Sequence, residues 1–162
     1  MGLLNWKPRA HPCALLALCI VLWLWPRGLV LEVRAADGAV QYARQVSVDD
    51  VVELSHVHSV EQTLVVERFT VVPKGLRLVM TSFGSAGAGL PASHAGLVTR
   101  DGRFVIEELD TVLCALPLLG SDATRSQLEL HGASYALRGR VTVSVRAYPT
   151  WHPGWRRGAA GQ

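Results

Sequence analysis

The sequence predicts an all-β fold: a single antiparallel β-sandwich or small barrel that follows an N-terminal membrane helix. Two observations predict the sheets, namely short runs of alternating or β-branched residues and the turn residues that separate them at regular intervals. A third observation, the uncharged run Cys13–Trp25, predicts the membrane helix. The chain therefore divides into an N-terminal signal or anchor segment (1–27), a β-rich extracytoplasmic domain (28–148) and a flexible tail (149–162).

The apolar run indicates the compartment of the rest of the chain. Lys7 and Arg9 precede the run, and Arg27 is the single positive charge directly after it. Because the more positive flank stays in the cytoplasm, we expect the C-terminal domain on the other side of the membrane. The expected location is the cell membrane, with a single pass and the domain in the periplasm or at the cell surface.

The apolar run is either kept as an anchor or removed. Its length suits a signal-peptide core of roughly 7–15 residues better than a spanning helix of roughly 20. The only small-x-small cleavage site, residues 33–35, lies within a predicted strand, however, and snorkelling of Arg9 and Arg27 lets Ala10–Pro26 span a bilayer. We therefore favour a retained anchor, and a cleaved secreted form beginning at Ala36 is the alternative.

The elements of the domain follow from alternation and turn residues. The expected strands are 29–35, 39–46, 51–60, 63–72, 76–83, 103–109, 127–131, 134–138 and 141–147. The only helix-length window in the domain is Asp110–Leu119, which Pro117 limits. Glycines and prolines in 149–162, a segment with Trp151 and Trp155, predict a tail that does not pack as an element.

Charge and cysteine content exclude two classes of protein. Residues 28–148 contain eleven of the sixteen Lys/Arg and all thirteen Asp/Glu, so the domain is slightly acidic although the chain has a formal charge of +3. Without a basic stripe, nucleic-acid binding is not expected. Cys13 and Cys19 lie in the apolar run, which leaves Cys114 alone in the domain and allows no internal disulfide.

The first candidate site is the run Ser55–Glu61. His56 and His58 share one face of the predicted strand, and zinc uses such i, i+2 pairs when a third ligand, such as His94 or Glu67, is available. Catalysis by Ser59 is weaker, because adjacent residues on a strand face opposite sides of the sheet. The favoured interpretation is structural: in the hairpin of 51–60 with 63–72, His58 pairs with Glu67.

The second candidate site is the glycine-rich stretch that follows the strand 76–83. It lacks the Gly-Lys-Ser/Thr of a phosphate-binding loop and continues into Pro91, so nucleotide binding is not expected. Glycines allow positive φ or the close approach of another backbone, and Leu90-Pro91 offers a rigid apolar contact. The stretch is therefore either an ordered structural loop or a loop that binds a partner.

The sequence resembles the domain-of-unknown-function family numbered 1850, which comprises small bacterial proteins with a β-rich body. The resemblance extends over most of 29–146 and is carried by His58-Ser59-Val60-Glu61, Glu67-Arg68-Phe69, Gly75–Leu78, Leu116–Leu118, 128–145 and the loop from Ser82-Phe83-Gly84 to Gly87-Ala88-Gly89-Leu90-Pro91. The chain departs from the family at Ser85-Ala86-Gly87, which intervene where the family's loop runs Phe-Gly-Ala-Gly directly.

The resemblance implies a role without assigning an activity. Members of the family tend to be encoded beside TRAP-type uptake transporters of the TAXI class, so it implies the permease or the solute-binding receptor as partner. No cofactor, catalytic residue or metal ligand is assigned. We favour a non-catalytic accessory or binding partner; the alternative is a small metal-dependent or hydrolytic enzyme centred on His58, Glu61 and Glu67. The candidate functional or structural motif consists of His58, Ser59, Glu61, Glu67, Phe83, Gly84, Gly87, Gly89, Leu90 and Pro91.

Overall fold

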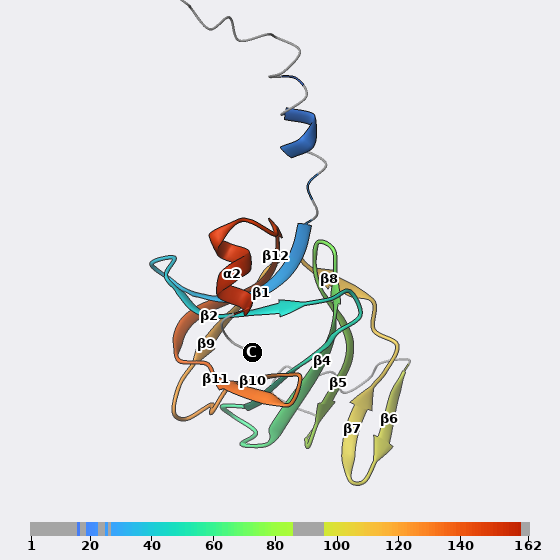
Figure 1. Ribbon diagram of the computed structural model, residues 1–162. Coiled ribbons are helices and arrows are strands. Elements are labelled where there is room, and N and C mark those ends of the chain that lie inside the picture. The colour runs from blue at the N-terminus through green and yellow to red at the C-terminus, as the bar shows by residue number, and fades with distance from the viewer. Residues whose placement is uncertain (1–15, 17–18, 23–24, 26, 86–95, 160–162) are drawn as a thin grey trace, which may run out of the picture.

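The computed structural model contains two antiparallel β-sheets that pack face to face (Figure 1). It describes residues 16, 19–22, 25, 27–85 and 96–159. In this part of the chain both sheets keep open edges, so the sandwich expectation holds and the alternative of a closed barrel is wrong.

The small sheet has the strand order β2-β1-β12-β9. Its strands are β1 (Arg27–Ala35), β2 (Val40–Val46), β9 (Leu116–Gly120) and β12 (Gly139–Pro149). Strand β1 pairs with β12 along its whole length, from Arg27 opposite Pro149 to Ala35 opposite Val141. The first and last strands of the fold are therefore central neighbours.

The large sheet has the order β11-β10-β3-β4-β5-β7-β6, and β8 also pairs with β5. Its strands are β3 (Val51–Val57), β4 (Leu64–Val72), β5 (Gly75–Phe83), β6 (Leu97–Arg100), β7 (Arg103–Ile106), β8 (Thr111–Leu113), β10 (Gln127–Leu130) and β11 (Ala133–Ala136). The first half of β5 pairs with β8 and the second half with β7. The large sheet thus extends on this side through the β6–β7 hairpin.

Alternation along the strands builds the core between the sheets. Leu31 and Val33 of β1 contribute from the small sheet, and Leu54 and Phe69 contribute from the large sheet; all four are almost completely buried. A second, smaller cluster on the large sheet contains Val65, Phe83 and Ile106, with Leu97, Phe104 and Leu109 packed against it. The end of the large sheet near Phe83 therefore has an apolar core of its own.

The window 110–119 is extended in the structure, so the helical expectation there is wrong. Residues Thr111–Leu113 form β8, and Leu116–Gly120 form β9. Pro117 of β9 lies opposite Thr142 of β12, and β9 is the last strand of its sheet. An edge strand tolerates proline because one side of its backbone needs no hydrogen-bond partner, whereas a helix interior does not.

The expected flexible tail is also wrong for the residues that the structure describes, because Pro153–Ala159 form helix α2. The helix lies on the outer face of the small sheet (Figure 1). Gly28 provides the space, since a Cβ there would overlap the ring of Trp155. The side-chain amide of Gln45 donates a 3.1 Å hydrogen bond to the Trp155 carbonyl. The absence of a side chain at Gly28 thus lets α2 pack against the small sheet, although this segment contains glycine and proline.

On the same outer face, the carboxylate of Glu32 is wholly buried in a hydrogen-bonded cluster. The hydroxyl of Tyr148 donates to one carboxylate oxygen at 2.9 Å, and Arg34 Nε donates to the other at 2.9 Å. Arg146 Nε lies 3.6 Å from the second oxygen. The hydrogen bond to Glu32 raises the pKa of Arg34, so the guanidinium stays charged.

The predicted membrane helix over Cys13–Trp25 lies largely outside the described residues. Among the residues that the structure describes, no helix is both long and apolar enough to cross a bilayer.

Candidate functional site

The turn between β3 and β4 is organised by His58. Its backbone N–H donates to the carbonyl of Thr63 at 2.9 Å, and its carbonyl accepts from the N–H of Gln62 at 2.9 Å. Its ring Nδ1 accepts a 3.2 Å hydrogen bond from the N–H of Glu61. His58 therefore caps this turn, and one of its two ring nitrogens is already engaged.

The same turn presents apolar side chains to solvent. Val60 at its tip is 70% exposed, and Leu64 at the start of β4 is 45% exposed. Ser59 and Gln62 beside them are also exposed. A water-facing valine and leucine next to polar side chains are compatible with a small contact surface for another protein.

The turn motif and the described start of the glycine-rich stretch, Phe83 and Gly84, meet at this end of the large sheet. Val65 of β4 lies opposite Phe83 of β5, and a Cβ on Gly84 would lie 3.1 Å from the Cβ of Thr63. A glycine is thus favoured at position 84, where the chain leaves β5 and passes close to the β3–β4 turn. The hydroxyl oxygen of Thr63 is buried without a hydrogen-bond partner among the described residues. We call this region, residues 58–64 with Phe83 and Gly84, the motif end.

The expected pair of His58 and Glu67 does not form. The register places Glu67 opposite Leu54 on one side and Thr81 on the other, whereas His58 bonds with Thr63. The expectation failed because the turn begins earlier than expected, so β3 ends at Val57 rather than at residue 60. His58 and Glu67 are therefore separate features of the structure.

Glu67 and His56 lie instead on the inner face of the large sheet. Burial raises the pKa of Glu67, which makes no hydrogen bond or ion pair with any described residue. Burial lowers the pKa of His56, and the neighbouring His58 lowers it further. His56 is opposite Val65, one diagonal position from Glu67. Both pKa shifts favour the neutral form of the side chain, for Glu67 and for His56.

The remaining motif residues divide into two sets. Phe83 is fully buried and stacks on Phe104 with ring centroids 5.7 Å apart, so it serves the second cluster rather than an exposed surface. Gly87, Gly89, Leu90 and Pro91 lie outside the described residues, and so does His94. The part of Gly87, Gly89, Leu90 and Pro91 in a binding loop stays a prediction, and so does His94 as a third metal ligand.

Sequence reasoning missed Arg103, which holds the motif end together. Its Nε donates to the hydroxyl of Ser82 at 2.9 Å, and its Nη2 donates to the carbonyl of Leu64 at 2.8 Å. One side chain of β7 thereby bonds to both β4 and β5. A single arginine at the start of a predicted strand has no pattern that could have revealed this role.

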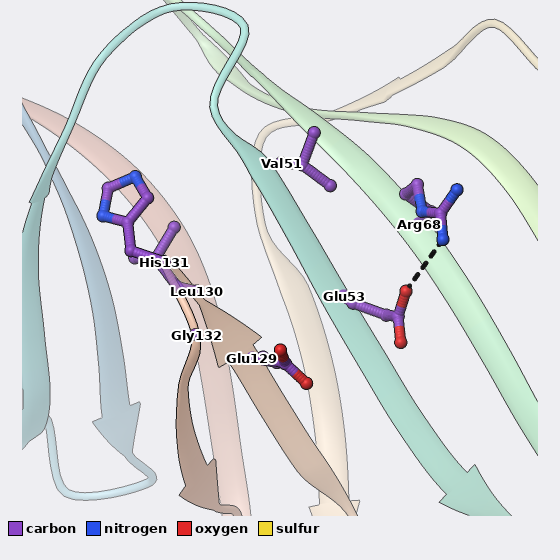
Figure 2. A pocket seen from close by; sticks show the side chains of 7 residues that line it. All are labelled: Val51, Glu53, Arg68, Glu129, Leu130, His131 and Gly132. Atoms are coloured by element: carbon purple, nitrogen blue, oxygen red, sulfur yellow. Dashed lines mark hydrogen bonds and ion pairs between the residues drawn. The ribbon is translucent and has the colours of Figure 1, made fainter.

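A hollow of about 330 Å³ lies elsewhere, on the outer face of β10, β3 and β4 (Figure 2). Glu53 points toward Arg68, and the pair forms a 3.1 Å ion pair. Glu129 lies opposite Glu53 on the neighbouring strand, and His131 bonds to Asp50 at 2.9 Å. The hollow therefore carries both signs of charge. The described residues contain no group of three or more His, Cys, Asp or Glu that could hold a metal ion.

Comparison with known proteins gives one match. The model of a family described as a domain of unknown function (DUF1850) matches residues 52–137, a range that begins in β3, ends just after β11 and includes the whole motif end. No curated protein and no solved structure shows a significant match.

Proposed function

We propose that this chain, which belongs to the DUF1850 family of domains of unknown function, is a membrane-anchored, extracytoplasmic binding partner of a TRAP-type solute transporter. The observation that carries the proposal is the meeting of the turn motif and the start of the glycine-rich stretch at one end of the large sheet. There the turn presents Val60 and Leu64 to solvent. On this proposal the motif end contacts the permease or the solute-binding receptor.

The arrangement of the fold supports this role. In Figure 1 the chain enters β1 at one end of the sandwich, and the β3–β4 turn and the end of β5 lie at the opposite end. If residues 1–27 anchor the chain, the motif end points away from the bilayer. A surface in that position is free to reach a receptor that shares the compartment.

The alternative, a small metal-dependent or hydrolytic enzyme centred on His58, Glu61 and Glu67, has weaker geometric support. Glu67 lies on the inner face opposite Leu54, and the ring of His58 caps its own turn through the N–H of Glu61. A general base and its orienting acid must lie within hydrogen-bond reach of each other. Because these side chains are not brought together, we favour the binding role.

Substitution at the motif end tests the proposal. The full chain is co-expressed with a TRAP-type permease and its solute-binding receptor, and co-purification of the three proteins is measured. We expect Val60→Asp to abolish co-purification while the melting transition moves by no more than a few degrees. Leu90→Asp, in the glycine-rich stretch that follows β5 in the sequence, is expected to have the same effect.

Val48→Asp is the matched control, because Val48 is also an exposed valine, at 49%, but precedes β3 rather than following it. We expect this variant to recover both transporter proteins in full. If Val60→Asp and Leu90→Asp also recover them in full, the motif end is not the contact surface. If the parent chain recovers neither protein, the transporter role itself is wrong.

A further inference from the structure

Two exposed tryptophans lie close together in space although they come from opposite ends of the sequence. Trp25 Nε1 donates a 2.9 Å hydrogen bond to the hydroxyl of Thr150, the residue before Trp151. Trp25 is 39% exposed and Trp151 is 50% exposed. Large aromatic side chains with a polar N–H are seldom left in plain water, and their amphipathic rings suit the boundary between water and lipid.

The segments that carry these tryptophans contain basic residues and no acidic ones. Arg27 and Arg156 are exposed, and neither 25–31 nor 149–159 contains an aspartate or glutamate. The nearest carboxylate of β1 in sequence, that of Glu32, is wholly buried and paired with Arg34. We call Trp25, Arg27, Trp151 and Arg156 the Trp/Arg surface.

The Trp/Arg surface is held on the folded domain. Trp155 fills the space above Gly28, and the ring of His152 stacks on Tyr148 with centroids 4.9 Å apart. The backbone N–H of His152 donates to the carbonyl of Pro149 at 2.8 Å, which closes the turn that carries Trp151. A surface that is already ordered loses little conformational entropy when it binds.

We infer that the Trp/Arg surface rests on the headgroup region of a bilayer that contains anionic lipid. The tryptophans supply amphipathic rings, and the arginines supply charge opposite to that of the lipid phosphates, each basic residue near such a surface strengthening binding about fivefold. The inference rests on the anchor in the proposed function and adds a second contact. In Figure 1, α2 and the start of β1 share the end from which the chain continues toward residues 19–22.

This second contact orients the domain. A single anchor allows the domain to tumble about the residue where it leaves the membrane. A fixed surface on the lipid would hold the sandwich upright and keep the motif end directed away from the bilayer. The orientation is thus a property that the Trp/Arg surface adds to the anchor.

Fluorescence quenching tests the inference on the full chain reconstituted into vesicles of phosphatidylcholine with one third phosphatidylglycerol. The emission of Trp151 is taken as the difference between the parent chain and Trp151→Phe. In vesicles whose acyl chains are brominated close to the headgroup, we expect this emission to fall at least twofold. Arg156→Glu, or the use of phosphatidylcholine alone, is expected to remove at least half of that loss.

Val60→Trp, which adds a tryptophan at the motif end, is the matched control and should respond to aqueous acrylamide but not to brominated lipid. If the chain floats with vesicles after carbonate washing but Trp151 behaves like this control, the inference is overturned and the anchor stands. If the chain does not float with vesicles, the anchor fails, and the proposed function fails with it. Quenching of Trp151 that is unchanged by Arg156→Glu and by neutral lipid overturns the role of lipid charge.

Discussion

One buried and one half-buried glutamate of this fold, Glu32 and Glu67, have opposite surroundings. Glu32 lies on the outer face of the small sheet and is bonded to Tyr148 and Arg34. Glu67 lies on the inner face of the large sheet and has no hydrogen-bond or ion-pair partner among the described residues. Burial of a charge is tolerable when partners replace water and costly when they do not.

The difference gives Glu32 a role in stabilising the fold. Stability alone does not explain why a glutamate stands at position 67. The Glu32 cluster joins β1 to the segment that leads into α2, so it secures the C-terminal part of the fold. Glu67 makes no comparable bond, and its raised pKa shows that the protein environment disfavours its charge. Perturbed pKa values occur more often at functional sites than elsewhere.

The largest effect is expected when the Glu32 cluster is broken. Arg34→Met keeps the apolar stem but leaves the carboxylate of Glu32 buried with only Tyr148 and the more distant Arg146. We expect a loss of about 3 kcal/mol in the free energy of unfolding, the low end for a buried pair that loses one partner. Urea denaturation measures it, and Glu32→Leu combined with Arg34→Met should recover part of the loss. A stability equal to that of the parent would contradict the structural role.

Displacing α2 from the small sheet is expected to lower the free energy of unfolding by less than breaking the Glu32 cluster does. In Gly28→Val, the new side chain meets the ring of Trp155 and displaces α2 from the small sheet. Overpacking of this kind costs about 1–3 kcal/mol. Hydrogen exchange followed by mass spectrometry should show faster exchange in 150–159, while the peptides of β4 and β5 keep the rates of the parent. Equal exchange in 150–159 would mean that the helix adapts to the larger residue.

Glu67→Gln is expected to raise the stability, whereas the two preceding variants lower it. Removing a charge that the fold disfavours should raise stability at neutral pH by on the order of 1 kcal/mol. Because the pKa of Glu67 is raised in the folded state, its protonated form favours folding below about pH 4.5, and this contribution is lost as the pH rises through the raised value.

The advantage of Glu67→Gln over the parent should therefore be small near pH 4 and grow toward pH 7. Thermal melts of both proteins across this range measure it. An advantage that does not depend on pH would show that the carboxyl of Glu67 does not titrate with folding.

The smallest effect is expected at His58. Its ring accepts one hydrogen bond, from the N–H of Glu61, in a part-exposed turn. His58→Ala should therefore cost about 0.5 kcal/mol, the low end of the net contribution of one hydrogen bond. His58→Asn, whose side-chain oxygen can accept the same bond, should recover most of it in thermal melts. A loss as large as that of Arg34→Met would restore the idea of a buried His58 pair.

Alternation revealed the fold more reliably than it revealed the site. Strand β1 was predictable because Leu29, Leu31 and Val33 recur at every second position, and β4 because it is rich in β-branched residues and ends at a turn with proline and glycine. The cross-strand neighbour of Glu67, Leu54, was not predictable, because the register depends on where the β3–β4 turn begins. The docking of α2 depends on the space above Gly28, which exists only after β1 and Trp155 are brought together.

The pairing of β1 with β12 also bears on the order in which the domain can form. Strand β1 is synthesised first of all the strands and finds its central neighbour only when the residues up to Pro149 have emerged. Pairings between segments so distant in sequence form slowly, since a long loop must close first. The edges of a newly made β1 therefore stay available to other chains during most of synthesis, and a product that ends before Gly139 leaves one of them permanently open.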